Sequence, residues 1–196
     1  MKLVHFFFLD IGLGKLEDHP IYLKNIETLK KINPETKVNI WNEIELDTVV
    51  KSHYPHLLDF WNNFPSKFYK IDFGRYLILK LYGGMYLDLD MECISKLPNE
   101  DEIDFINVFI NDKGKETFNN NVIYFRNRKL YDELIDFAIH RYKSNKMPTS
   151  WKRRRLLFTV GARMFHKFCR DRKFVKTNVN SFVKDLETKS WLKVEV

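Results

Sequence analysis

The chain has 196 residues, of which 44% are hydrophobic and 15% aromatic, with only 7 glycines and 6 prolines. This composition excludes a disordered, collagen-like or low-complexity chain, because it supplies enough apolar surface for a core. The net charge of +7 suits a phosphate-bearing ligand, a nucleic acid or an anionic membrane surface, and does not choose among them. Because no linker or internal repeat interrupts the sequence, we predict one domain over residues 1–196.

Strand and helix patterns alternate from the beginning of the chain, which is typical of an α/β sheet sandwich. The expected strands lie at 3–9, 38–41, 85–90, 105–110 and 122–126. The expected helices lie at about 18–32, 44–61 with a break near Pro55, 67–82, 129–142 and 154–168. The helix at 67–82 is apolar on nearly all sides, which indicates that it is buried.

Two further features bear on where the protein works. The two cysteines, Cys93 and Cys169, are too far apart in sequence for a metal-ligand or redox motif, which is typical of a reduced, cytoplasmic protein. The apolar run at 3–9 is much shorter than the roughly 18 residues of a membrane helix. We therefore expect no membrane span and a cytoplasmic location, as for an enzyme of a bacterial or a virus-infected cell.

An Asp-x-Asp stands at the end of the strand expected at 85–90. In extended chain, residues two apart point to one face, so Asp88 and Asp90 are directed at one point. Such a carboxylate pair suits Mg²⁺ or Mn²⁺, with the remaining positions left to water and ligand phosphates. The carboxyl ends of strands are also where open α/β sheets bind ligands. Taken alone, the motif fits equally well a strand that runs out into solvent.

The preceding helix carries Asp72, Arg75 and Tyr76 at positions i, i+3 and i+4, which share one helix face. Charge on a buried helix is costly unless it is paired or faces a polar cavity. One interpretation is therefore a local Asp72–Arg75 ion pair. In the other, the Arg75 guanidinium and a metal on the Asp-x-Asp bracket one diphosphate.

These residues lie in a block that reads IDFGRY at 71–76 and LYGGMYLDLD at 81–90. It resembles the signature of DxD sugar-nucleotide glycosyltransferases of family 32 type. It also resembles the catalytic core of the large clostridial glucosylating toxins. The likeness extends more loosely to HFFF at 5–8, NP at 33–34, Trp41, TVG at 159–161 and SW at 190–191. The resemblance implies a single-domain GT-A fold, in which helices flank a Rossmann-like mixed sheet.

The resemblance also implies roles for matching positions. Asp88 and Asp90 would hold the metal, Phe8 would stack on the base, and the segment with Ser190 and Trp191 would close over the diphosphate. The residues it places at the donor are Phe8, Asp72, Arg75, Tyr76, Asp88, Asn121, Ser190 and Trp191, and those it places in catalysis are Asp72, Arg75, Asp88 and Asp90. The chain departs from the family at Phe8, where a Trp is usual, at Phe6 for Gln, and at Ala162 for Pro.

The function that the resemblance implies is metal-dependent sugar transfer from a UDP- or GDP-linked donor to a hydroxyl acceptor, a glycan, with retention of anomeric configuration. Mn²⁺ or Mg²⁺ would be the cofactor, and nucleic acid is not an expected partner. Two alternatives remain open. One is a metal-dependent nucleotidyl- or phosphotransferase. The other is a non-enzymatic binder of nucleic acid or an anionic surface, acting through the basic run at 152–155.

Overall fold

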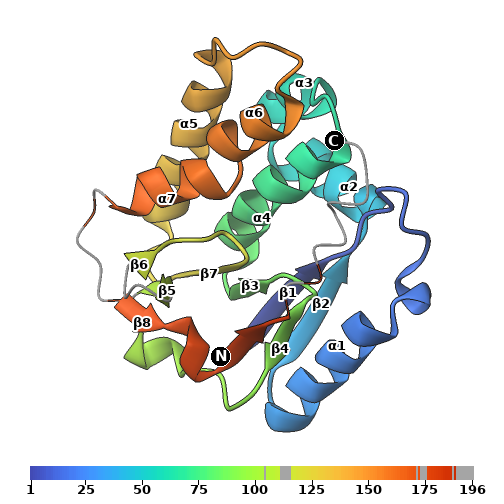
Figure 1. Cartoon of the computed structure of the whole chain (residues 1–196), viewed down its shortest axis with the longest axis vertical. Helices are drawn as coiled ribbons and strands as arrows, with labels where there is room; N and C mark the ends of the chain where they lie inside the picture. The colour runs from blue at the N-terminus through green and yellow to red at the C-terminus, as the bar shows by residue number, and fades with distance from the viewer. Residues whose placement is uncertain (104, 111–115, 171, 173–175, 187, 189–196) are drawn as a thin grey trace.

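The computed structural model describes every residue except 104, 111–115, 171, 173–175, 187 and 189–196. A mixed sheet crosses the middle of the molecule (Figure 1). Helices α4 to α7 pack on one face of this sheet, and α1 packs on the other. The predicted α/β fold class is therefore confirmed.

The strands are β1 (Leu3–Phe7), β2 (Lys37–Trp41), β3 (Met85–Leu87), β4 (Met91–Cys93), β5 (Phe105–Ile110), β6 (Glu116–Thr117), β7 (Val122–Phe125), β8 (Lys176–Asn178) and β9 (Val183–Asp185). The α-helices are α1 (Pro20–Ile32), α2 (Glu43–His53), α3 (Leu58–Asn62), α4 (Lys67–Tyr82), α5 (Lys129–Lys143), α6 (Lys152–Thr159) and α7 (Ala162–Arg170). Short 3-10 turns are η1 (Leu16–Asp18), η2 (Pro55–Leu57), η3 (Glu100–Glu102) and η4 (Val179–Ser181).

The order of the strands in the main sheet is β2-β1-β3-β7-β5-β6, with β8 paired to β5. Strand β1 lies between β2 and β3 and runs parallel to both. The direction reverses at β7, which is antiparallel to β3 and to β5. Strand β4 leaves the main sheet and forms an antiparallel pair with β9. The carboxyl ends of β1 and β3 therefore meet the beginning of β7 at one edge of the sheet.

Successive side chains of the central strands go to opposite faces of the sheet, as the period of a strand requires. Val4 and Phe6 pack in the cluster that includes α1. Phe7 and Tyr86 pack in the other cluster, which includes α4 to α7. Because both faces are covered by helices, these strands are apolar almost throughout rather than alternating apolar and polar.

Helix α4 has the predicted bounds and is buried along most of its length. It ends at Gly83 and Gly84, which have φ angles of +73° and +77°, a region that favours glycine. These two residues turn the chain directly into β3. Although α4 is apolar on nearly all sides, no helix of the described residues is long and apolar enough to cross a membrane.

His5 connects this corner to the neighbouring strand. Its Nε2 lies 2.9 Å from the carbonyl oxygen of Gly83, and its Nδ1 accepts a hydrogen bond of 3.0 Å from Nε1 of Trp41. Burial lowers the pKa of His5 to about 4, so the ring is neutral at pH 7. The unfolded chain binds the His5 proton more tightly than the folded protein does. The free energy of unfolding therefore decreases as the pH falls from about 6.5 towards 4. His5 is thus a structural residue.

The structure corrects two of the predicted elements. The strand expected at 85–90 ends at Leu87, because Met91 N–H donates to the Asp88 carbonyl and closes a turn. The helix expected at 154–168 is two helices, α6 and α7, separated by Val160 and Gly161. The Tyr76 hydroxyl donates to the Val160 carbonyl at 2.7 Å, which takes an acceptor that a continuous helix would use internally.

We expect Gly84→Ala to destabilise the fold more than Gly12→Ala, although both positions have positive φ. A Cβ at Gly84 would lie 2.6 Å from the Leu3 carbonyl oxygen, a backbone atom of β1. A Cβ at Gly12 would meet no atom of the described part of the chain that closely. Gly12→Ala should cost about 1 kcal/mol for the backbone conformation alone, and Gly84→Ala about 2–3 kcal/mol or more. Denaturant unfolding of both variants measures the difference, and equal losses would contradict this account.

Candidate active site

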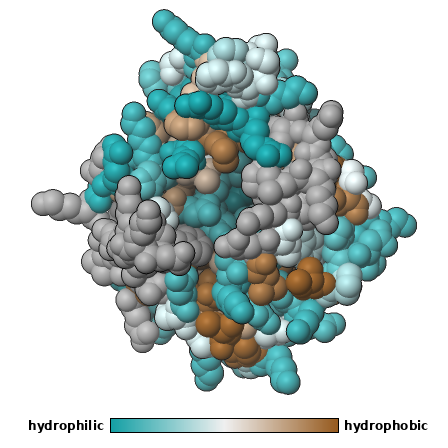
Figure 2. All heavy atoms as spheres, in the orientation of Figure 1, coloured by the Kyte–Doolittle hydropathy of each residue, from teal (hydrophilic) through white to brown (hydrophobic). Residues whose placement is uncertain are grey.

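A cavity of about 510 Å³ opens where the ends of β1 and β3 meet the beginning of β7. It is visible as the hollow near the centre of Figure 2. Its wall combines residues from both ends of the sequence, namely Phe7, Phe8, Leu9, Ile11, Leu13, Tyr22, Phe68, Ile71, Asp72, Arg75, Tyr86, Asp88, Leu89, Asp90, Asn119, Asn120, Asn121, Leu156, Leu157, Ala162 and Asp185. This is the sheet edge at which the carboxylate pair was expected.

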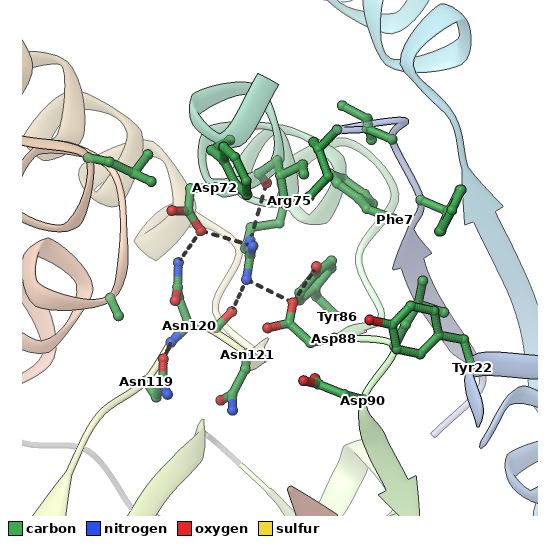
Figure 3. A pocket seen from close by; sticks show the side chains of 18 of the residues that line it. Phe7, Tyr22, Asp72, Arg75, Tyr86, Asp88, Asp90, Asn119, Asn120 and Asn121 are labelled. Atoms are coloured by element: carbon green, nitrogen blue, oxygen red, sulfur yellow. Dashed lines mark hydrogen bonds and ion pairs between the residues drawn. The ribbon is translucent and has the colours of Figure 1, made fainter. Parts of the chain in front are cut away.

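Arg75 lies at the centre of the polar wall and is buried (Figure 3). Its Nη2 is 2.9 Å from Oδ1 of Asp72, and its Nη1 is 3.2 Å from Oδ1 of Asp88. Nη1 also donates to the Asn120 carbonyl at 2.5 Å, and Nε donates to the Ile71 carbonyl at 3.2 Å. The guanidinium stacks over Tyr86, with 4.4 Å from Cζ to the ring centroid. Arg75 thus joins α4 to the Asp-x-Asp and to the segment before β7.

Asp72 projects from α4 into the same cavity. Besides Arg75, its Oδ1 accepts a hydrogen bond of 2.8 Å from Nδ2 of Asn120. Its Oδ2 lies against Gly161, since a Cβ built on that glycine would be only 2.8 Å away. Burial raises the pKa of Asp72, while Arg75 and Asn120 oppose that shift. The local ion pair and the polar cavity, which sequence reasoning treated as alternatives, are both present.

The Asp-x-Asp lies on the turn between β3 and β4 rather than on extended strand. Asn25 of α1 supports this turn by donating to the Leu89 carbonyl at 2.8 Å, and Leu89 itself is buried. Asp88 Oδ1 receives the Tyr86 hydroxyl at 2.6 Å in addition to Arg75. Both carboxylates still project into the cavity, as Figure 3 shows. The geometry that sequence reasoning assigned to the pair was wrong, but the convergence of its two side chains was right.

A third carboxylate, Asp185 of β9, lines the cavity beside this turn. Its Oδ2 accepts a hydrogen bond of 3.2 Å from Nδ2 of Asn121, and its strand pairs with β4 so that Asp185 lies opposite Met91. Sequence reasoning missed Asp185, and it missed the role of Tyr86 as a donor to Asp88. No local motif marks Asp185, because only the pairing of β4 with β9 brings it to the site.

Neighbouring acidic groups raise the pKa of Asp88 and that of Asp90. Burial raises the pKa of Asp90 to about 6, and the charges of Asp88 and Asp185 add to this shift. A hydrogen bond of 3.0 Å from Thr188 opposes it. Burial also raises the pKa of Asp88, with Arg75 and Tyr86 opposing the shift and Asp72 and Asp185 adding to it. This part of the cavity therefore carries excess negative charge at neutral pH, which a cation would relieve.

The donor set fits a hard divalent cation. The side-chain oxygen of Asn121 is buried and has no hydrogen-bond partner among the described residues. Asn121 lines the cavity together with Asp88 and Asp90. An orphaned acceptor beside two carboxylates supplies the all-oxygen environment that Mg²⁺ and Mn²⁺ prefer. No three His, Cys, Asp or Glu side chains of the described residues are grouped to hold a metal by themselves. Ligand oxygens would therefore have to complete the coordination.

The remaining predicted donor residues divide into three groups. Phe8 and Asn121 line the cavity, and their contact with a donor stays a prediction. Tyr76 does not, because it is fully buried and its hydroxyl is directed to Val160 behind the cavity wall; its expected donor contact is corrected to a structural role. Ser190 and Trp191 lie outside the described residues. Thr188, close to them in sequence, hydrogen-bonds Asp90.

We expect Asp90→Asn to stabilise the metal-free protein at pH 8. The raised pKa means that the folded state binds the Asp90 proton more tightly than the unfolded chain, so ionisation destabilises the fold as the pH rises from about 4 through 6. Removing the charge should raise the free energy of unfolding by about 1–2 kcal/mol at pH 8 and by much less at pH 4. Urea unfolding in a chelator at both pH values tests this, with Asp136→Asn as an exposed control. No gain at pH 8 would disprove it.

Comparison with known proteins agrees with this geometry. Residues 22–112 match the family described as "Glycosyltransferase sugar-binding region containing DXD motif". An uncharacterized glycosyltransferase of Acanthamoeba polyphaga mimivirus is 36% identical over 72 residues, 36% of this chain and 29% of that protein. A mannosyl phosphorylinositol ceramide synthase of Saccharomyces cerevisiae is 34% identical over 84 residues, 42% of this chain and 22% of that protein. The matched segments thus span less than a third of either relative.

Among solved structures, one described as "PaToxG Glycosyltransferase" superimposes with a TM-score of 0.59 at 15% identity, covering 85% of this chain and 68% of that one. At this identity the likeness concerns the fold, and it agrees with the fold expected from the resemblance. The sequence matches add the Asp-x-Asp region itself, which includes α4, β3 and the turn that carries Asp88 and Asp90. Residues 22–112, a little under half of the chain, are thus similar to the DXD sugar-binding region of glycosyltransferases.

Proposed function

We propose that this chain transfers a sugar from a nucleoside-diphosphate donor to a hydroxyl acceptor with the help of a divalent cation. The observation that carries the proposal is the convergence of Asp88, Asp90 and the unpartnered oxygen of Asn121 on one cavity, with the Arg75–Asp72 pair in its wall. A cavity of about 510 Å³ lies within the range of small-molecule sites. Its carboxylates need a cation before they can accept a diphosphate.

Asp88, Asp90 and Asn121 would hold Mn²⁺ or Mg²⁺. When bound there, the cation would neutralise the charge of the donor diphosphate and that of the leaving nucleoside diphosphate. Around it, the apolar side chains of Leu156 and Leu157 from α6 exclude water that would hydrolyse the donor.

Arg75 acts mainly as a positioning residue in this proposal. Its nitrogens already contact Asp72, Asp88 and two carbonyls, so it fixes both carboxylates rather than extending freely to a phosphate. Asp72 then offers its oxygens to hydroxyl groups of the donor sugar. Phe8 and Phe7 supply aromatic surface at the edge of the cavity for the base. We assign no nucleophile, and we retain the proposal that the configuration at the anomeric carbon is preserved.

We further propose that the sugar is mannose and that the acceptor hydroxyl belongs to the polyol headgroup of an anionic lipid, rather than to a free glycan. The support is the name of the yeast relative, a mannosyl phosphorylinositol ceramide synthase.

The test of the class is a panel of UDP- and GDP-linked sugars incubated with the protein, with Mn²⁺ or with a chelator. We expect cation-dependent release of the nucleoside diphosphate from one donor, with GDP-mannose the first to be tried. Release of pyrophosphate or transfer of a phosphate would favour the phosphotransferase alternative instead. Complete inactivity, with no thermal stabilisation by UDP or GDP plus Mn²⁺, would overturn the proposal.

Two substitutions should abolish this turnover. Asp90→Asn removes a proposed cation ligand, and Arg75→Ala releases both Asp72 and Asp88. Each should lower kcat by about 100-fold or more, the scale for removal of one electrostatic stabiliser. Asp136→Asn, an exposed substitution on α5, is the matched control. Near-normal kcat values in both variants would disprove the assignment of the site.

Gly161→Ala should lower kcat by displacing Asp72. The added Cβ would meet Asp72 Oδ2 at 2.8 Å, and it would also lie 3.1 Å from Leu157 Cα, so the carboxylate must move. A displacement of about 1 Å at a reacting group can cost on the order of 100-fold in rate. If the effect passes through Asp72, adding Gly161→Ala to an Asp72→Ala variant should lower kcat little further. Losses of kcat that multiply in full in the double variant would contradict this.

A further inference from the structure

The net positive charge of this chain comes from one region of its sequence. Residues 137–170 contain ten lysines and arginines and no aspartate or glutamate, so the other 162 residues together have a net charge of −3. The region comprises most of α5, all of α6 and α7, and the loop between α5 and α6. Because the acidic residues lie elsewhere in the sequence, this region carries a net positive charge that can attract anions.

The densest run of cations in this region, residues 152–155, lies where α6 begins. We call Trp151, Lys152, Arg153 and Arg154 the basic face. All four residues are exposed, and Trp151 is 48% accessible. Arg154 stacks on Trp151, with 5.0 Å from Cζ to the ring centroid, which holds the indole at the surface. Lys152 and Arg154 form no ion pair within the described residues. With no acid in its first turn, α6 also places these cations at the positive end of its dipole.

The basic face adjoins the cavity through the same helix. Arg153 precedes Leu156 and Leu157 by three and four residues, so it lies one turn along the side of α6 that lines the cavity. Figure 2 shows hydrophilic side chains over α6 beside the central hollow. A surface bound to this face would therefore lie next to the cavity opening.

We propose that the basic face docks the chain on an anionic lipid bilayer and presents lipid headgroups to the cavity. The proposal rests on the function proposed above, since it supplies the lipid acceptor. A surface of clustered cations around an exposed tryptophan matches what bilayer surfaces bind: cations are attracted by anionic headgroups, and indole rings settle at the headgroup level. A nucleic acid would engage the same cations, and the test distinguishes it.

The experiment measures sedimentation of the protein with vesicles of phosphatidylcholine alone or with 30 mol% phosphatidylinositol. The variant is Lys152→Gln with Arg153→Gln and Arg154→Gln. Arg155 is retained because it is half-buried beside Tyr69 and Tyr142. The control replaces three exposed lysines of α1, Lys24, Lys30 and Lys31, with Gln.

We expect the wild-type protein to bind the vesicles that contain phosphatidylinositol, more weakly as the salt concentration rises, and not to bind vesicles of phosphatidylcholine alone. The variant should bind on the order of 100-fold more weakly, since each cation near the surface contributes about a factor of five, and the control should lose much less. Brominated lipids should quench tryptophan fluorescence in the wild type but not in Trp151→Phe. Equal binding by the variant and the control, or displacement of vesicles by a single-stranded RNA that binds more tightly, would overturn the proposal.

Nucleoside diphosphate release without vesicles separates the two proposals. If the wild type and the variant release it equally while only the wild type binds vesicles, both proposals stand. Release without any vesicle binding overturns docking alone. Vesicle binding through the basic face, with no release from any donor, overturns the proposed function and, with it, the presentation of headgroups to the cavity.

Discussion

The buried guanidinium of Arg75 is the interaction on which the rest of the site depends. A cation inside an apolar helix costs several kcal/mol unless its hydrogen bonds are met, and here they are met by groups from three separate elements. That requirement fixes α4, the turn after β3 and the segment before β7 relative to one another. The carboxylates of Asp72 and Asp88 are consequently held in place before any ligand arrives, which lowers the ordering cost of binding.

The same arrangement leaves the acidic side of the cavity short of positive charge. Arg75 compensates Asp72 and one oxygen of Asp88, whereas burial and the charges of Asp88 and Asp185 raise the pKa of Asp90. Repulsion among these carboxylates lowers the stability of the metal-free protein, and a bound cation would remove that repulsion. The Asn121 oxygen, buried without a hydrogen bond from the described residues, also lowers the stability of the metal-free protein, by a smaller amount.

Local patterns in the sequence predicted much of this structure. The bounds of α4 followed from its unbroken apolar run and the two glycines after it, and the Asp-x-Asp was correctly placed at the edge of the sheet. What could not be predicted depends on contacts far apart in sequence. Asp185 reaches the site only because β9 pairs with β4, and α6 separates from α7 because Tyr76, 84 positions earlier, takes the Val160 carbonyl. A helical period carries no signal for either event.

The pairing of β4 with β9 also bears on how the chain is synthesised. The segment that hydrogen-bonds Asp90 follows it by 98 residues, and Asp185 is almost as remote from Asp88. A nascent chain therefore displays its Asp-x-Asp turn on the ribosome long before the strand that flanks it has been translated. During that interval β4 has an unpaired edge and the acidic turn lacks its cover, so this part of the molecule is the one most in need of protection from premature pairing.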